Sequence, residues 1–192
     1  MRGRRVGDLF FEPGKNLETS MIDQLTINLP IIIRTCREND LSDLEWFGLL
    51  TEYRQTIRNA FQRYQKGEII MLIAEANHFP IGQVWIDLTK RREQSIGFLW
   101  SLRVFIPFQN LGIGTRLIAS AERQLKTQRF RISELSVEKD NPHAQRLYER
   151  LGYQVVRDNI EEWEYTPPNG KLVHVRNDEW ILHKSLVDEG AA

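Results

Sequence analysis

Two glycines one residue apart, Gly112 and Gly114, mark the point where a strand-like segment gives way to a helical one. The segment before them ends in PFQNLGIG (107–114), and the segment after them carries one apolar helical stripe of Leu117, Ile118, Ala121 and Leu125. Backbone N–H groups at the positive end of a helix dipole bind phosphate, and glycine lets that backbone approach a ligand without an intervening Cβ. The pattern predicts a phosphate-binding turn, with a tight turn that holds no ligand as the alternative.

Two familiar phosphate-binding loops do not fit this segment. The P-loop requires Gly-Lys-Ser/Thr, where this chain has Gly114, Thr115 and Arg116. The dinucleotide-binding fingerprint requires a third glycine, where this chain has Leu117. The segment therefore points to a different ligand that contains a pyrophosphate.

Strand and helix patterns precede the turn in a definite order. A β-branched strand begins at Ile31, and the spacing of the next apolar residues predicts a short helix from Leu41 and a second helix from Tyr53 that Gly67 ends. Three apolar segments then predict an antiparallel meander at 69–76, 81–88 and 96–105. The third is almost wholly apolar, which predicts burial on both of its faces in the middle of a sheet.

The segments after the turn continue the alternation. A strand at 132–137 precedes a helix at 141–152, for which Asn141 is a good N-cap, Pro142 suits the first position and Gly152 is a stop signal. The apolar stripe of this helix comprises Ala144, Leu147, Tyr148 and Leu151. The strand YQVVR follows, and the remainder predicts two or more strands linked by a PPNG turn.

Length and charge limit the class of protein. The 192 residues, 41% of them apolar, can bury one sizeable core, so we expect one domain at 31–187, a flexible extension at 1–30 with Met21 as an alternative start, and a tail at 188–192. Lys plus Arg and Asp plus Glu each number 26, which argues against nucleic acid as a partner. No apolar run approaches the length of a membrane span, and neither a signal peptide nor a disulfide framework is present, so we expect a cytoplasmic protein.

Cysteine and histidine carry no clear chemistry in this sequence. Cys36 ends an apolar strand and is interpreted as a small core residue. The four histidines lack the spacing of metal ligands, so no metal site is predicted. They are His78, His143, His174 and His183.

Two motifs, in the right order, resemble one family. Gln109 to Gly114 is similar to the QxxGxG segment of the GNAT superfamily of acyl-CoA-dependent N-acyltransferases, and NPHAQRLYERLGY, from Asn141, is similar to its second signature. The order of strands and helices from Ile31 to Leu186 also resembles the GNAT fold. The resemblance implies an α+β protein with a central mixed, mostly antiparallel sheet, whose splayed middle strands are flanked by helices.

The resemblance implies where the cosubstrate acetyl-CoA binds. Coenzyme A would lie between the splayed strands 96–105 and 132–137, with its pantetheine arm paired to the backbone of Leu102, Arg103 and Val104 like an added strand. The Val104 N–H would stabilise the thioester oxyanion, for which one donor is worth roughly 3 kcal/mol in other acyl-transfer enzymes. The pyrophosphate would bind backbone N–H groups, with Arg116 as an added charge; these groups belong to Gln109, Asn110, Leu111, Gly112, Ile113, Gly114 and Thr115.

Tyr148 is the predicted acid that protonates the leaving thiolate, by analogy with the family's tyrosine. The alternative is that Tyr148 only completes the apolar stripe of its helix. Asn141 likewise has two compatible interpretations, as a helix N-cap and as a contact to the pantetheine arm and hence part of the cofactor site.

The sequence does not single out a general base or the acceptor pocket. Carboxylates near the expected cleft are Glu75, Asp87, Glu162, Glu164 and Glu179, each of which is more commonly a solvated strand residue. Trp163, Tyr165 and Trp180 either floor an apolar or cationic-amine pocket or belong to the core.

The resulting hypothesis is direct transfer of an acetyl group from acetyl-CoA to a primary amine of a small molecule, peptide or protein. The alternative function is a noncatalytic acyl-CoA-binding sensor or interaction module. Some members of the family dimerise through their C-terminal strands, so the resemblance leaves a homodimer open.

Overall fold

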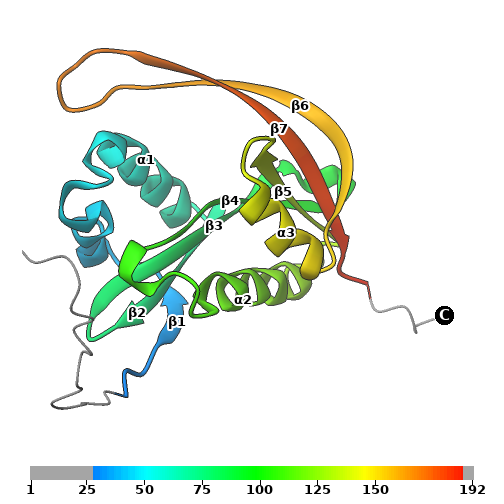
Figure 1. The fold of residues 1–192 in the computed structure, drawn as a ribbon, viewed down its shortest axis with the longest axis horizontal. Coiled ribbons are helices and arrows are strands. Elements are labelled where there is room, and N and C mark those ends of the chain that lie inside the picture. Colours follow the sequence, from blue (N-terminus) through cyan, green and yellow to red (C-terminus); the bar gives the residue numbers. More distant parts are fainter. Residues whose placement is uncertain (1–27, 188–192) are drawn as a thin grey trace, which may run out of the picture.

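The computed structural model describes residues 28–187, and the predicted extension and tail fall almost entirely outside this range. Seven strands form one mixed sheet in the order β1-β2-β3-β4-β5-β7-β6, and every neighbouring pair is antiparallel except β4 and β5 (Figure 1). The strands are β1 (Ile32–Thr35), β2 (Ile69–Ala76), β3 (Phe79–Arg91), β4 (Ile96–Val104), β5 (Ile132–Glu138), β6 (Gln154–Tyr165) and β7 (Val173–Ser185). The α-helices are α1 (Arg54–Gln65), α2 (Ile113–Thr127) and α3 (Pro142–Arg150).

The sheet has a hydrophobic core on each face, because alternate strand residues point in opposite directions. One core joins the sheet to α2 and α3 and includes Leu72, Ala74, Val84 and the complete predicted stripe of α2. The other core joins the sheet to α1 and includes Met71, Ile73 and Trp85. Cys36 lies in this second core, where burial raises the pKa of its thiol to about 12, which confirms its interpretation as a core residue.

The predicted short helix from Leu41 is wrong in type. The segment before α1 folds instead as three 3₁₀ turns, η1 (Glu38–Asp40), η2 (Asp43–Gly48) and η3 (Thr51–Tyr53). Trp46 and Phe47 adopt left-handed φ values of 46° and 56°, which an α-helix does not tolerate. Tertiary contacts hold this shape, since the Trp46 indole N–H donates to the Pro80 carbonyl at 2.7 Å.

The predicted burial of the third meander strand on both faces holds for only part of β4. Residues at the start of β4 are buried, whereas those from Trp100 to Val104 are only partly buried. β4 and its parallel neighbour β5 pair over four residues, from Ile96 opposite Ile132 to Leu99 opposite Leu135, and then diverge. The second half of β4 is therefore a wall of a gap in the sheet.

A β-bulge coincides with this divergence. Trp85 pairs with Trp100 and Gln83 pairs with Arg103, so β4 has two residues opposite the single intervening residue of β3. The first of these two, Ser101, has a left-handed φ of 53°. Because a bulge bends its strand and increases its twist, this one turns β4 away from β5 while the pairing with β3 continues.

The C-terminal strands form a long hairpin. YQVVR and the next apolar segment are one continuous strand, β6, rather than two strands. The hairpin arches away from the sheet toward the start of α1 (Figure 1), where the Tyr165 hydroxyl donates to the Glu52 carboxylate at 3.1 Å and the Tyr53 ring contacts that of Tyr165. The hairpin thus spans the face of the sheet on which α1 lies. Among residues 28–187, no helix is long and apolar enough to cross a membrane.

Candidate active site

A cavity of about 520 Å³ occupies the gap between β4 and β5. Its lining includes Val84, Leu99 and Ile118 from the core with α2, and also Trp85 and Thr56 from the side of α1. The cavity therefore runs between the two faces of the sheet. Its volume falls in the usual range for a small-molecule pocket.

The backbone of Val104 is directed at this gap. The Phe105 N–H donates to the Ile81 carbonyl of β3 at 2.8 Å. Since consecutive residues of an antiparallel strand direct their N–H groups to opposite sides, the Val104 N–H points away from β3. The Val104 carbonyl also points away from β3 and accepts a hydrogen bond from the Gln109 side-chain amide at 3.0 Å. Arg103, by the same alternation, directs its N–H toward β3 and contributes its side chain to the cavity.

The paired-glycine turn forms the N-terminus of α2. Gly112 is the N-cap and has a left-handed φ of 77°, which glycine adopts without strain. No side chain of residues 28–187 caps this end, and the first helical bond is from the Arg116 N–H to the Gly112 carbonyl at 3.1 Å. A Cβ placed on Gly114 would lie 3.9 Å from Val104 and 4.0 Å from Leu147, so β4, α2 and α3 meet here. The turn can present several backbone N–H groups to an anion.

Tyr148 lines the cavity from α3 and is 8% exposed. Burial raises the pKa of its phenol to about 12, which keeps the hydroxyl protonated at neutral pH. The hydroxyl has no hydrogen-bond partner among residues 28–187, whereas that of neighbouring Tyr153 is paired with Ser133 at 2.7 Å. Tyr148 also packs in the core with α2, as its place in the apolar stripe predicts, and its role as the acid stays a prediction.

Asn141 caps α3 as predicted. Its side-chain oxygen accepts a hydrogen bond from the Ala144 N–H at 3.1 Å. Asn141 does not line the cavity, and of the predicted cofactor-site residues only Leu102, Arg103 and Tyr148 do so. Of the others, Val104 ends β4, Gln109 to Thr115 lead into and begin α2, and Asn141 stands at the start of α3.

Four of the five carboxylates considered as a base lie elsewhere and have partners. Glu75 pairs with Arg34, and Asp87 accepts from Arg63 at 2.9 Å. The other two carboxylates have exposed partners. Glu162 pairs with Arg176 at 3.4 Å, and Glu164 pairs with His174 at 2.7 Å.

Glu179 is the exception, because it lines the cavity from β7 and is 5% exposed. One of its carboxylate oxygens, Oε2, is buried without a hydrogen-bond partner among the described residues. Burial raises the pKa of Glu179, the charge of Glu161 raises it further, and hydrogen bonds from Ser136 and Asn177 oppose the shift. A carboxyl group with a raised pKa in a cavity is suited to accept a proton near neutral pH.

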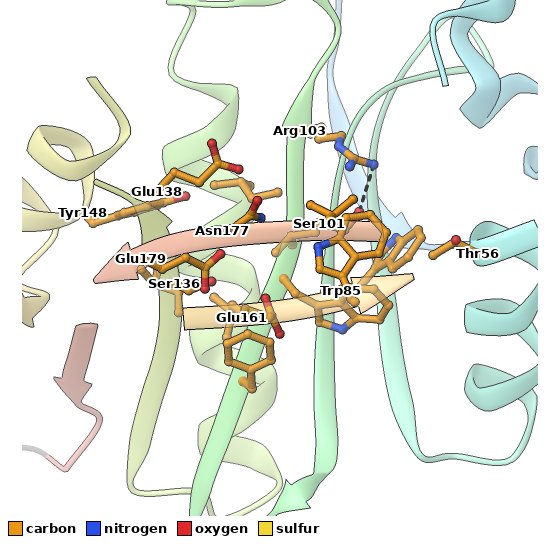
Figure 2. A pocket seen from close by; sticks show the side chains of 18 of the residues that line it. Thr56, Trp85, Ser101, Arg103, Ser136, Glu138, Tyr148, Glu161, Asn177 and Glu179 are labelled. Carbon is orange, nitrogen blue, oxygen red and sulfur yellow. Dashed lines mark hydrogen bonds between the residues drawn. The ribbon is translucent and has the colours of Figure 1, made fainter. Parts of the chain in front are cut away.

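The sequence analysis missed most of the other polar cavity residues. Glu138 follows the predicted strand of β5, and Glu161 and Asn177 come from paired positions of β6 and β7 (Figure 2). The sequence signal that could have identified Glu161 was the alternation along β6, which places Glu161 on the same face of the strand as Trp163. Trp163 does line the cavity, whereas Tyr165 braces the hairpin against Glu52, and Trp180 packs against the core with α2.

Comparison with known proteins agrees with this architecture. A sequence profile of the acetyltransferase (GNAT) family matches residues 37–153, which is more than half of the chain. The chain therefore belongs to the GNAT acetyltransferase family, and the predicted fold class is confirmed. No curated protein is significantly similar to it in sequence.

Solved GNAT structures share the fold at low sequence identity. PaiA N-acetyltransferase of Thermoplasma acidophilum, solved in complex with coenzyme A, is 18% identical over 81% of this chain and 99% of its own, with a TM-score of 0.63. YncA of Salmonella typhimurium, solved with acetyl-CoA, is 14% identical over 85% and 98%, with a TM-score of 0.65. The ribosomal-protein-S18-alanine N-acetyltransferase of Escherichia coli is 17% identical over 85% and 99%, with a TM-score of 0.61.

The raised pKa of Glu179 predicts a pH-dependent effect of Glu179→Gln on stability. The folded protein binds this proton more tightly than the unfolded chain, so wild type loses stability as pH rises from below the ordinary value of 4.5 through the raised pKa. Glutamine does not titrate, so the free energy of unfolding of the variant, relative to that of wild type, should increase as pH rises from below 4.5 through the raised pKa of Glu179. Urea unfolding measures the difference, with exposed Glu162→Gln as the control. A difference independent of pH would contradict the assignment.

Proposed function

We propose that the protein transfers an acetyl group from acetyl-CoA directly to the amine of an acceptor bound in the cavity between β4 and β5. The observation that carries this proposal is the meeting, at one gap in the sheet, of an outward-facing Val104 N–H, the α2 N-terminus and the unpaired Tyr148 hydroxyl. Relatives in the fold family that were solved with coenzyme A or acetyl-CoA support the choice of cosubstrate. We assign pyrophosphate binding to the backbone around Gly112 and Gly114.

The proposed reaction has no covalent enzyme intermediate. The neutral amine nitrogen attacks the thioester carbonyl carbon, and the oxyanion that forms accepts a hydrogen bond from the Val104 N–H. The C–S bond then breaks, and the leaving sulfur takes the Tyr148 phenolic proton. Burial disfavours both a tyrosinate and a thiolate, so the high pKa of Tyr148 does not by itself prevent this transfer.

We assign the role of general base to Glu179. The ammonium of the acceptor must lose one proton before attack and the nitrogen loses another on amide formation. Glu179 is the one carboxylate of the five considered that lines the cavity, and its buried Oε2 has no partner among the described residues. Of the two protons lost by the nitrogen, Glu179 passes one to solvent, and the other returns through the cavity to the tyrosinate and restores the Tyr148 phenol.

Thiol release from acetyl-CoA distinguishes this function from an acyl-CoA sensor. Purified protein is incubated with acetyl-CoA and a panel of small amines, lysine peptides and peptide N-termini, and free thiol is followed with time. Amine-dependent thiol release together with an acetylated product in mass spectrometry is expected. Calorimetric binding of acetyl-CoA with no release from any amine would instead favour the sensor.

Loss of either proton-transfer group should reduce turnover. Tyr148→Phe and Glu179→Gln should each lower kcat by roughly 100-fold, the usual contribution of acid or base catalysis, with little change in the dissociation constant of CoA. Tyr153→Phe is the matched control for the first, because its buried hydroxyl bonds to Ser133 outside the cavity. Glu162→Gln is the control for the second. A variant that retains wild-type kcat would lose its assigned role.

The phosphate-binding turn is tested by Gly114→Val. A Cβ at this position has room within the protein, but a branched side chain would occupy the space beside Val104 and Leu147 that the cofactor needs. Calorimetry should show CoA binding weakened by roughly tenfold or more, or about 1.4 kcal/mol. Leu111→Ala is the control, because the exposed Leu111 side chain is removed while its backbone N–H stays. Unchanged affinity in Gly114→Val would contradict the assigned phosphate site.

A further inference from the structure

Arg103 is an unusual cation within the cavity. Its only hydrogen bond among the described residues is a long one of 3.4 Å to the Ser101 hydroxyl of its own strand (Figure 2), and no carboxylate lies within ion-pair distance. Its guanidinium carbon lies over the Tyr53 ring, 4.9 Å from the ring centroid, a contact that satisfies none of its N–H donors. Burial lowers the pKa of Arg103, although a guanidinium keeps its charge in proteins.

The surroundings of Arg103 do not supply the missing anion. The field of Glu52 reaches Arg103, but the Glu52 carboxylate accepts the hydroxyl of Tyr165 and belongs to the brace between the hairpin and η3. A planar fork of N–H donors matches the two oxygens of a carboxylate, and such charge-assisted pairs are strong where water is partly excluded. The unmatched donors therefore fit an anionic group on a ligand.

The charges of the cavity are separated along its length. Arg103 and Ser101 lie on the side of the cavity toward Thr56 and α1, whereas the carboxylates of Glu138 and Glu179 lie on the side toward Tyr148, and Glu161 lies beside Glu179 (Figure 2). An acceptor that carries an amine at one end and an anion at the other would match this arrangement at both ends. A diamine or polyamine would bring a second cation toward Arg103 and match only one end.

We propose that the acceptor is a zwitterion, a small amino carboxylate whose carboxylate binds Arg103 and whose amine is directed toward Glu179 and the thioester. This inference rests on the proposed acetyl transfer and specifies its substrate class. The aromatic side chains of the lining, among them Trp85, Trp100 and Trp163, suit an apolar body. Arg103 is assigned to substrate binding and takes no part in bond making.

The test compares amines that differ only in the carboxylate. The panel pairs 4-aminobutyrate, 5-aminopentanoate and 6-aminohexanoate with propylamine, butylamine and pentylamine, whose amines have similar basicity. L-leucine and L-phenylalanine are compared with isopentylamine and phenethylamine at equal concentrations of neutral amine. For at least one pair, kcat/KM should be roughly tenfold or more higher with the carboxylate, the usual gain from a hydrogen-bonded charge pair. Equal or better turnover of the uncharged partner in every pair overturns the proposal.

Arg103 variants separate substrate binding from a structural role. Arg103→Gln should lower kcat/KM for the preferred amino carboxylate by about 10- to 100-fold, mainly through KM, and should lower kcat/KM for the matched alkylamine far less. Arg103→Lys keeps the charge but lacks the planar fork of donors, so its kcat/KM for the preferred amino carboxylate should fall less than that of Arg103→Gln. Tyr53→Phe, which keeps the ring under Arg103, should retain the preference. An equal loss for both members of a pair would show that Arg103 only supports the fold and would overturn the proposal.

A binding measurement keeps this proposal separate from the proposed transfer. Calorimetry compares N-acetyl-6-aminohexanoate with N-pentylacetamide on the CoA complex, and the shorter homologues in the same way. Preference for the acid in wild type, lost in Arg103→Gln, supports the carboxylate site even where no amine is turned over. If the protein shows no preference for the acid, the proposed carboxylate site is overturned. If uncharged amines still release thiol in that case, the proposed acetyl transfer stands.

Discussion

The architecture of the site depends on how far β4 can pair with β5. Parallel pairing covers four residue pairs and ends at Leu99, and the bulge at Ser101 bends β4 while its hydrogen bonds to β3 continue. A strand that leaves one neighbour but keeps the other exposes a row of backbone groups inside the protein, where they need partners. In this chain the Gln109 side chain satisfies one of them, the Val104 carbonyl. An extended ligand that adds itself as a strand would satisfy more, which is why the gap suits the pantetheine arm of acetyl-CoA.

The divergence also connects the two faces of the sheet. On one face, the N-terminus of α2 and Tyr148 of α3 stand beside the gap, and on the other face lie η3, the start of α1 and the C-terminal hairpin. Strand alternation assigns different tasks to adjacent residues, since the Val104 backbone faces the gap while the Arg103 side chain joins the cavity. A donor and an acceptor can therefore enter from opposite faces and meet where β4 and β5 separate.

Local signals predicted much of the fold and part of the site. The glycine turn, the stripe of α2 and the Asn141 cap depend on neighbouring residues, so their spacing was sufficient. The 3₁₀ segment was mistaken for a helix because its apolar spacing is helical, whereas the left-handed φ values of Trp46 and Phe47 are held by contacts with distant β3. Glu179 could not be distinguished from Glu162 in the sequence. The burial of Glu179 and its proximity to Glu161 arise only when the hairpin folds over the sheet.

The same contrast between local signals and tertiary contacts explains why membership of the family indicates the acyl donor more readily than the acceptor. In the proposed function, backbone geometry at the end of β4 and the start of α2 holds the cofactor, and this geometry depends on glycine at the N-cap more than on any particular side chain. In the proposed function, the acceptor side is lined by side chains that alternate along β6 and β7, such as Glu161 and Trp163, so substitutions there would change side chains rather than strand pairing. Because the hairpin is braced at its far end by Tyr165 and Glu52, such changes alter the lining of the cavity while its frame stays in place. In the proposed function, charge placement in that lining, rather than the fold, therefore decides which amine reaches the thioester.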